Sequence, residues 1–509
     1  MLNRDHGKFL YIIPALCAFI IGILVTVRYQ WPIGWDIYYH IHLARVYMLE
    51  GLTLHDPLYN APSGNIINYP PIFHLTLILV SYILQTGLFE AARFMQPVLI
   101  SAIVLSVTIV ASRFYEDRYT GLAAGILFIS GSVAVRSVSP IPENMALIIL
   151  PFSIYMYYEF FREERDRLVS ALLSGALMGT VALIHPAATV CLVFSVTLIT
   201  AAVAVANIVS GSVGALKRTA TGYLAFLIVG IIIASIWWLP ALYVKSTGGA
   251  GGVSTGLQFS RGMSILHYPG AFGYLTALLS IPGLVAAVRK RGLRDLFIVS
   301  WILSMLILSK GYYIGINVIS YRVLIYMMIP LSILGAAGLR YCSGIIERKS
   351  RVAAGIFFVS VLFVALFQGY AHITSPKTAD YGAMTPYGRI QIAPPSESEY
   401  ELAEWFREQG GVAAFSNYYT MGFVAAYSDQ KVNPILFTDP DALKPSKLHE
   451  KRIKYLVFDR RLKADGNFTF RARDNFLFYG SKTRVDRLEY PYLRKVYENG
   501  DFVVYLVTA

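Results

Sequence analysis

The chain has 509 residues, of which 56% are hydrophobic and only 15% are charged. Soluble domains carry about 25% charged residues, so this composition excludes an ordinary soluble protein. The net charge of +13 does not indicate nucleic-acid binding, because lysine and arginine lie mostly in short loops between apolar segments. The three cysteines lie in apolar segments or at their ends, which argues against a disulfide framework.

The apolar segments predict a mainly α, polytopic membrane protein with about eleven transmembrane helices, because each is long enough to cross a hydrocarbon core of about 30 Å. The first apolar run, Phe9 to Val27, is too long for a signal-peptide core and is interpreted as a retained span. The predicted spans are residues 9–28, 93–112, 119–135, 144–161, 168–184, 187–208, 219–243, 272–288, 295–310, 320–340 and 352–371.

The loops between these spans alternate between basic and nearly neutral along the chain. The positive-inside rule therefore places the basic loops and the N-terminus in the cytoplasm. The same alternation requires the apolar segment Pro71 to Leu88 to lie in or on the outer leaflet without crossing it. This segment belongs to a long first external loop, residues 29–92, of a transmembrane domain that we predict over residues 1–372.

The last part of the chain differs in composition from the rest. Residues 373–395 contain four prolines and are predicted to be a linker. Residues 396–509 predict a small α/β domain outside the membrane, which begins with a capped helix that ends at two glycines. The expected elements that follow are strands 412–416, 431–437 and 453–458, helices 421–428 and 443–451, and a hairpin of strands 496–497 and 502–507 around E-N-G-D.

The first external loop gathers acids, imidazoles and aromatic residues, beginning with G-W-D-I-Y-Y-H-I-H-L-A-R at residues 34–45. Asp36 opens a predicted helix, and helical spacing places His40 on the same face. A carboxylate and an imidazole four residues apart can share a proton or a metal ion. The alternative for Asp36 is an ordinary helix N-cap.

A second acid, Glu143, is the only one in its short loop and begins a span. The alternative is that this carboxylate simply interacts with the helix dipole. The loop charges place Asp36 and Glu143 on the same side of the membrane. We therefore expect the two carboxylates to lie close together and to share one substrate or one ion.

Arg322 lies near the outer end of a predicted span. An arginine in a membrane helix is costly and is a functional candidate by default. Its guanidinium matches the geometry of phosphate oxygens, although snorkelling to the interface is the alternative. The candidate substrate-binding residues are Trp35, Tyr38, Tyr69, His74 and His267. A lone histidine at a span end, such as His267, is more often structural.

At these positions the sequence resembles the GT-C superfamily of membrane glycosyltransferases. It is most similar to the branch that contains the catalytic subunit of archaeal and eukaryotic oligosaccharyltransferase. W-D-I-Y-Y-H-I-H-L-A-R is similar to that branch's first acidic motif, whose catalytic aspartate falls on Asp36. N-Y-P-P-I-F-H, residues 68–74, is similar to the Tyr-Pro stretch of the same loop. S-Y-R-V-L-I-Y-M-M-I-P-L resembles the late-span segment whose arginine, here Arg322, engages the donor phosphate.

The sequence also departs from that branch. R-S-V-S-P-I-P-E-N-M-A resembles the second acidic motif, with its paired acids reduced to Glu143. The W-W-D-Y-G motif that reads the acceptor sequon is missing, and the nearest stretch is S-N-Y-Y-T-M-G-F at residues 416–423. The segment 244–271 contains no acid where the family has a glutamate. These departures argue against transfer to an Asn-x-Ser/Thr sequon, and they favour a polyprenyl-phosphate-linked monosaccharide as the donor.

The resemblance implies an enzyme that transfers a sugar from a polyprenyl-(pyro)phosphate-linked donor to a protein, glycan or lipid acceptor at the extracytoplasmic face. Asp36 would act as general base, tuned by His40 or His74, and Arg322 would stabilise the departing phosphate. A divalent cation, Mg²⁺ or Mn²⁺, shared by Asp36 and Glu143 stays an open alternative. A transporter or flippase for lipid-linked sugars and a catalytically inactive scaffold are the competing functions.

Overall fold

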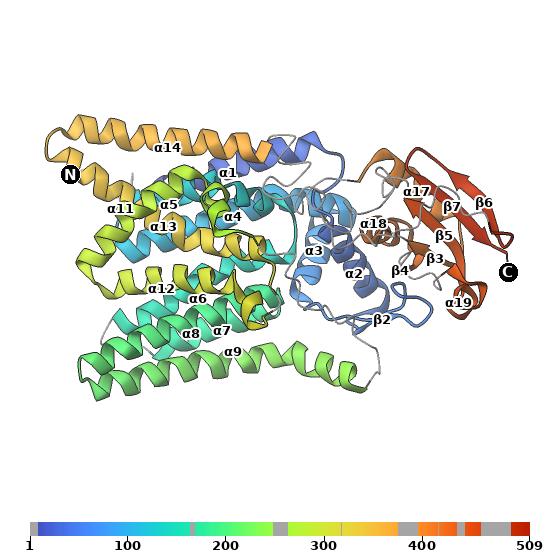
Figure 1. Cartoon of the computed structure of the whole chain (residues 1–509), viewed down its shortest axis with the longest axis horizontal. Coiled ribbons are helices and arrows are strands. Elements are labelled where there is room, and N and C mark those ends of the chain that lie inside the picture. The colour runs from blue at the N-terminus through green and yellow to red at the C-terminus, as the bar shows by residue number, and fades with distance from the viewer. Residues whose placement is uncertain are drawn as a thin grey trace.

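The computed structural model describes residues 9–162, 168–247, 263–316, 318–374, 395–415, 417–434, 443–459 and 490–508. Within these ranges the chain forms a long helical bundle followed by a smaller domain that contains a β-sheet (Figure 1). Helices α2 (Asp36–Glu50) and α3 (Ile72–Leu84) lie between the two parts.

Each predicted span coincides with one or two helices, although turns interrupt or end some of the spans. The helices of the bundle are α1 (Phe9–Arg28), α4 (Leu88–Tyr115), α5 (Arg118–Ser130), α6 (Pro142–Arg162), α7 (Leu168–Ala182), α8 (Pro186–Val209), α9 (Val213–Thr247), α10 (Tyr268–Phe272), α11 (Tyr274–Lys290), α12 (Leu293–Leu308), α13 (Ser320–Glu347) and α14 (Arg351–Thr374). Among the described residues, seven helices are long and apolar enough to cross a membrane, or up to nine if each of two bent pairs is one span. Helices α7 and α12 have only 15 and 16 residues. The chain is therefore a multi-span membrane protein.

The predicted span 119–135 is bent rather than straight. Helix α5 ends at Ser130, and the chain continues at an angle of 89° in the 3-10 helix η1 (Ser132–Val138). Gly131 separates the two helices, and a Cβ atom there would lie 2.7 Å from Cε of Met328. Close packing against α13 thus fixes the bend, which a straight periodic pattern could not reveal.

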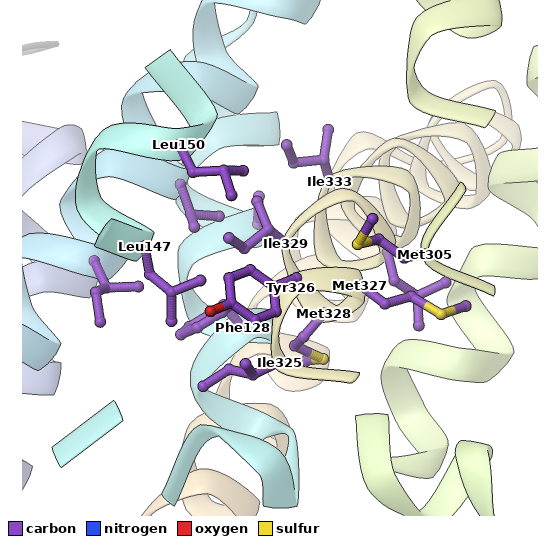
Figure 2. Packing of buried hydrophobic residues seen from close by; sticks show 14 of the residues in the cluster. Phe128, Leu147, Leu150, Met305, Ile325, Tyr326, Met327, Met328, Ile329 and Ile333 are labelled. Atoms are coloured by element: carbon purple, nitrogen blue, oxygen red, sulfur yellow. The ribbon is translucent and has the colours of Figure 1, made fainter. Parts of the chain in front are cut away.

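Helix α13 forms the centre of the bundle. In its most apolar stretch 89% of the residues are buried, against 22% in α9 and α14, which lie at the edges. Figure 2 shows side chains of α13, including Ile325 and Ile329, packed among those of neighbouring helices such as Phe128, Leu147 and Met305. The first residues of α13 therefore belong to the most deeply buried of the seven long apolar helices.

Helix α3 supports the interpretation of the first external loop. It has 13 residues, which is too short to cross a hydrocarbon core of about 30 Å. The same loop contains a two-stranded antiparallel sheet formed by β1 (His55–Asp56) and β2 (Asn65–Ile66). Helix α9 reaches β2, so the loop packs against the bundle on one side.

The C-terminal domain has the predicted α/β pattern. Its strands are β3 (Val412–Phe415), β4 (Lys431–Pro434), β5 (Ile453–Asp459), β6 (Leu493–Glu498) and β7 (Phe502–Val507), in the order β4-β3-β5-β7-β6. The first three strands are parallel, and β5, β7 and β6 are antiparallel. The helices are α17 (Glu397–Arg407), α18 (Tyr418–Ser428) and α19 (Pro445–Glu450). Most of the predicted linker, from residue 375 to 394, lies outside the described residues.

The first external loop and the C-terminal domain share one hydrophobic core. Trp31, Tyr38 and Phe89 pack their rings around Phe423 of α18, with centroid distances from 5.1 to 6.3 Å. The loop also extends the sheet, because Tyr59 forms a parallel bridge with Val432 of the edge strand β4. The end of the helical bundle that carries α2 is thereby covered by the sheet domain.

Candidate active site

Asp36 is the first residue of α2, directly after a turn at Gly34, whose φ of +98° favours glycine. Its carboxylate does not cap the helix: the N-cap position is Trp35, and no side chain caps the helix. Instead, Oδ2 of Asp36 accepts hydrogen bonds from Nη2 of Arg322 at 3.2 Å and from Nη2 of Arg136 at 3.3 Å. Asp36 is thus tied to two cations from distant parts of the chain.

Arg136 connects Asp36 to the second acid. Its Nε donates to Oε2 of Glu143 at 2.7 Å, and the two side chains are 10% and 3% exposed. Asp36 and Glu143 therefore contact the same guanidinium group, as expected for two carboxylates of one site. We call Asp36, Arg136, Glu143 and Arg322 the charged network.

Helix N-termini converge on the charged network. Glu143 is the second residue of α6, and Arg322 is the third residue of α13. His185 is the N-cap of α8, where Nδ1 accepts from the N–H of Ala188, and it lies 3.4 Å from the hydroxyl of Tyr326. Helix N-termini carry partial positive charge and favour anions, so this end of the bundle is suited to hold a phosphate.

A pair of histidines lies beside the network. Nδ1 of His40 and Nε2 of His74 are 3.0 Å apart, and both rings are buried. Burial holds the pKa of His40 well below its ordinary value and lowers that of His74 to about 3. Both imidazoles are therefore neutral at pH 7. The expectation that His40 shares a proton or ion with Asp36 is corrected: Asp36 turns toward the arginines, whereas His40 turns toward α3.

The candidate substrate-binding residues differ in where they lie. The ring of Tyr69 lies 4.7 Å from that of His40 and 6.1 Å from that of His185, at the edge of the network. Burial and the nearby Asp36 raise the pKa of Tyr69, so its hydroxyl stays protonated. Trp35 and Tyr38 are buried in the shared core, where the Tyr38 hydroxyl donates to the carbonyl of Pro32 at 2.7 Å. They pack against the sheet domain and do not line an open surface.

The structure separates His267 from these residues. It ends the short 3-10 helix Ile265–His267, with an exposed side chain. Within the part of the chain that the structure describes, it makes no contact with the charged network. The sequence reasoning missed Arg136, although it is the only basic residue in the short loop that contains Glu143. The sequence did contain a signal for Arg136, because it is a single arginine seven residues before the single acid of the same loop, Glu143.

The residues present do not fit a resident metal ion between Asp36 and Glu143. Both carboxylates are already paired with the Arg136 guanidinium. Across the described ranges, no group of three or more His, Cys, Asp or Glu side chains is placed to hold a metal. We therefore assign no step to a metal ion.

No family model matches the chain, and no curated protein matches its sequence. Solved structures match its fold. Oligosaccharyltransferase from Archaeoglobus fulgidus in the apo form aligns with a TM-score of 0.67 and 12% identity, over 92% of this chain and 71% of that chain. The same enzyme has been solved with zinc and sulfate, and with an inhibitory peptide and a dolichol-phosphate.

Two further structures are similar over nearly the whole chain. ArnT from Cupriavidus metallidurans bound to undecaprenyl phosphate aligns with a TM-score of 0.61 and 10% identity, over 99% of this chain and 98% of that chain. The arabinofuranosyltransferase AftD from Mycobacteria aligns with a TM-score of 0.60 and 16% identity, over 100% of this chain and 40% of that chain. The chain therefore has the fold of the GT-C membrane glycosyltransferases.

Proposed function

We propose that the chain is an integral membrane glycosyltransferase that transfers a sugar from a polyprenyl-phosphate-linked donor to an acceptor at the extracytoplasmic face. The observation that carries the proposal is the contact between Asp36 and Arg322, which joins a carboxylate to a guanidinium where helix N-termini converge. This pairing supplies a proton acceptor and a phosphate partner side by side. The shared fold with ArnT and AftD supports the same chemistry.

In this proposal Arg322 binds the donor phosphate. Its Nε is buried without a hydrogen-bond partner among the described residues, so a phosphate oxygen can satisfy it. Guanidinium groups match phosphate oxygens in geometry and keep their charge. As the bond from the sugar to the phosphate breaks, Arg322 stabilises the negative charge that develops on the leaving group.

Asp36 acts as the general base on the acceptor hydroxyl. Before the donor binds, its Oδ2 is already occupied by contacts with both arginines. A phosphate that takes over Arg322 removes one of these cations and frees the carboxylate. Donor binding would then prepare Asp36 for proton transfer, and the sugar carbon would be inverted by direct attack.

The remaining assignments follow from the same placement. Glu143 and Tyr69 orient the sugar, and neutral His40 and His74 shape the wall of the site. The positive-inside pattern puts the N-terminus in the cytoplasm and the sheet domain outside, where it would contact the acceptor. We propose that the donor carries a monosaccharide on a single phosphate, and that the acceptor is a protein, glycan or lipid.

The direct experiment incubates the purified protein with radiolabelled polyprenyl-phosphate sugars and a membrane extract that contains acceptors. The proposal expects transfer of the label with release of polyprenyl phosphate. Movement of intact donor across a vesicle membrane, without release, would instead identify a transporter or flippase. If the protein binds donors but neither transfers nor moves them across the whole panel, it is an inactive scaffold.

A further inference from the structure

Arg136 occupies the position between the two carboxylates of the site. Its Nε contacts Glu143 at 2.7 Å, and its Nη2 contacts Asp36 at 3.3 Å. The two acids come from different helices and lie far apart in the chain, so the guanidinium is what joins them. A bridging divalent cation would have to make these same contacts.

The surroundings hold Arg136 in this place. Its side chain is 10% exposed, so it does not extend to the interface as a snorkelling arginine would. Asn144, in the first turn of α6, donates from Nδ2 to the carbonyl of Arg136 at 2.8 Å and to that of Ser139 at 2.5 Å. The backbone of η1 and the start of α6 are therefore fixed together, which positions the guanidinium against Glu143.

The charges of the network are balanced without an ion. Asp36 and Glu143 carry two negative charges, and Arg136 and Arg322 carry two positive ones. Before the donor phosphate binds, a divalent cation would add two positive charges beside the buried Arg136 guanidinium, which disfavours its binding. The sequence also offers no further acid as a ligand from the segment 244–271.

We propose that the Arg136 guanidinium takes the place of a divalent cation, so that the protein binds no ion between Asp36 and Glu143 and its sugar transfer is independent of metal. The claim that sugar transfer is independent of metal rests on the proposed function, whereas the claim that no ion binds between the two carboxylates does not. Arg136 holds the two carboxylates in place and supplies positive charge beside Arg322.

The claim that no ion binds between Asp36 and Glu143 can be tested directly by measuring Mn²⁺ binding to the purified full-length protein, with electron paramagnetic resonance and calorimetry. The wild type is expected to show no specific site. Arg136→Ala removes the cation between the carboxylates and is expected to bind one Mn²⁺ specifically, where the wild type binds none. Arg136→Ala/Glu143→Gln should lose this gain, because only one carboxylate remains.

Arg340→Ala is the matched control. Arg340 also pairs with a carboxylate, Asp117, at 2.8 Å, but at the opposite end of α13, and among the described residues its guanidinium bridges no second acid. It should gain no Mn²⁺ site. A wild-type Mn²⁺ site that disappears in Asp36→Asn would overturn the proposal, and so would a folded Arg136→Ala that gains no site. Arg136→Gln, which keeps a polar side chain, replaces Arg136→Ala if the latter does not fold.

Measurements of transfer activity then test whether sugar transfer is independent of metal. Activity of the wild type should be unchanged by EDTA, and Mn²⁺ should restore part of the activity of Arg136→Ala. If EDTA abolishes transfer, the metal-independence claim is wrong although the protein is still a glycosyltransferase. If no transfer is found with any donor, the proposed function fails, and the binding result stands by itself.

Discussion

At the residue scale, replacing Arg322 should impair both donor binding and turnover, whereas replacing Asp36 should impair turnover alone. The contact of Arg322 with a donor phosphate exists before the transition state and strengthens in it, whereas the basicity of Asp36 matters only as the proton moves. The structure also joins the two residues, since Nη2 of Arg322 donates to Oδ2 of Asp36. Their separate roles are therefore best resolved by measuring binding and turnover independently.

Arg322→Ala should weaken binding of polyprenyl phosphate by about 10–100-fold, because a hydrogen bond to a charged group contributes about 1.5–3 kcal/mol. Arg322→Lys keeps the charge but loses the planar fork, so it should recover only part of this affinity. Binding can be measured by calorimetry in detergent. Equal affinity of Arg322→Ala and the wild type would show that the phosphate binds elsewhere.

The buried histidine pair predicts a pH dependence of stability. The pKa of His74 is about 3 in the folded protein, against 6.5 as its ordinary value, because of burial. The unfolded chain therefore binds a proton that the folded chain does not, and stability falls as the pH drops below about 6.5. Between pH 6.5 and pH 5, His74 alone should cost about 1.6 kcal/mol, with His40 acting in the same direction.

Thermal unfolding in detergent between pH 7 and pH 5 measures this effect. His74→Gln should reduce the fall in unfolding temperature, because one of the two buried imidazoles is gone. The exposed His267 provides the control, and His267→Gln should leave the pH dependence as it is. If His74→Gln and the wild type lose stability in parallel over this range, the buried pair is not the source.

At the scale of elements, helix α18 attaches the sheet domain to the first external loop. Phe423 is fully buried and packs against Trp31 and Tyr38 of the loop and Tyr427 of its own helix. Phe423→Ala should destabilise the protein by about 3–5 kcal/mol, because it leaves a cavity where several rings meet. Tyr490→Ala, at a half-exposed aromatic residue of the same domain, should cost much less.

Cross-linking shows whether the loss in Phe423→Ala falls on this contact. Arg45 of α2 and Asp429, just after α18, form an ion pair through the ends of their side chains, so cysteines at these two positions lie within reach of a short bismaleimide cross-linker. This cross-link should form in a cysteine-free background and form more slowly once Phe423→Ala is added. Unchanged rates would mean that the sheet domain is held in place by other contacts.

The elements were predicted well because their patterns are local. Apolar runs and loop charges located the helices, and capping residues located α17, whose Ser396 and Glu399 form a capping box. The bends were not predicted, because the angle between α5 and η1 depends on how closely Gly131 approaches Met328. Hydrophobic periodicity indicates which side of a helix is buried, but it does not indicate where close packing interrupts the helix.

At the scale of the whole molecule, the loop charges predict the orientation in the membrane. Single cysteines at Arg351 and Lys447, in a background without the three native cysteines, test this orientation in sealed vesicles or cells. Both positions are exposed, at 90% and 54% for their side chains. Lys447→Cys should react with an impermeant reagent from outside, and Arg351→Cys only after the membrane is opened. Reaction of both from one side would refute the alternation of the loops.

The site was predicted in part. Asp36, Glu143 and Arg322 come together although they lie in three separate segments, which loop charges and motif resemblance could anticipate. The role of Arg136 as the link between the acids was not foreseen, because the sequence shows which residues share a side of the membrane but not which pairs touch. Tyr38 was assigned to a substrate, and only the packing of the sheet domain shows that it is buried.

The central claim is that Asp36 is the base of a sugar transfer, and single-turnover transfer by Asp36→Asn tests it most directly. The asparagine keeps the size and hydrogen-bonding capacity but not the basicity. We predict a rate about 10²–10⁴-fold below that of the wild type, with polyprenyl-phosphate binding retained. Asp429→Asn, at a half-exposed aspartate that also pairs with an arginine, should transfer at the wild-type rate. Near-normal transfer by Asp36→Asn, with any sugar donor that the wild type accepts, would contradict the account.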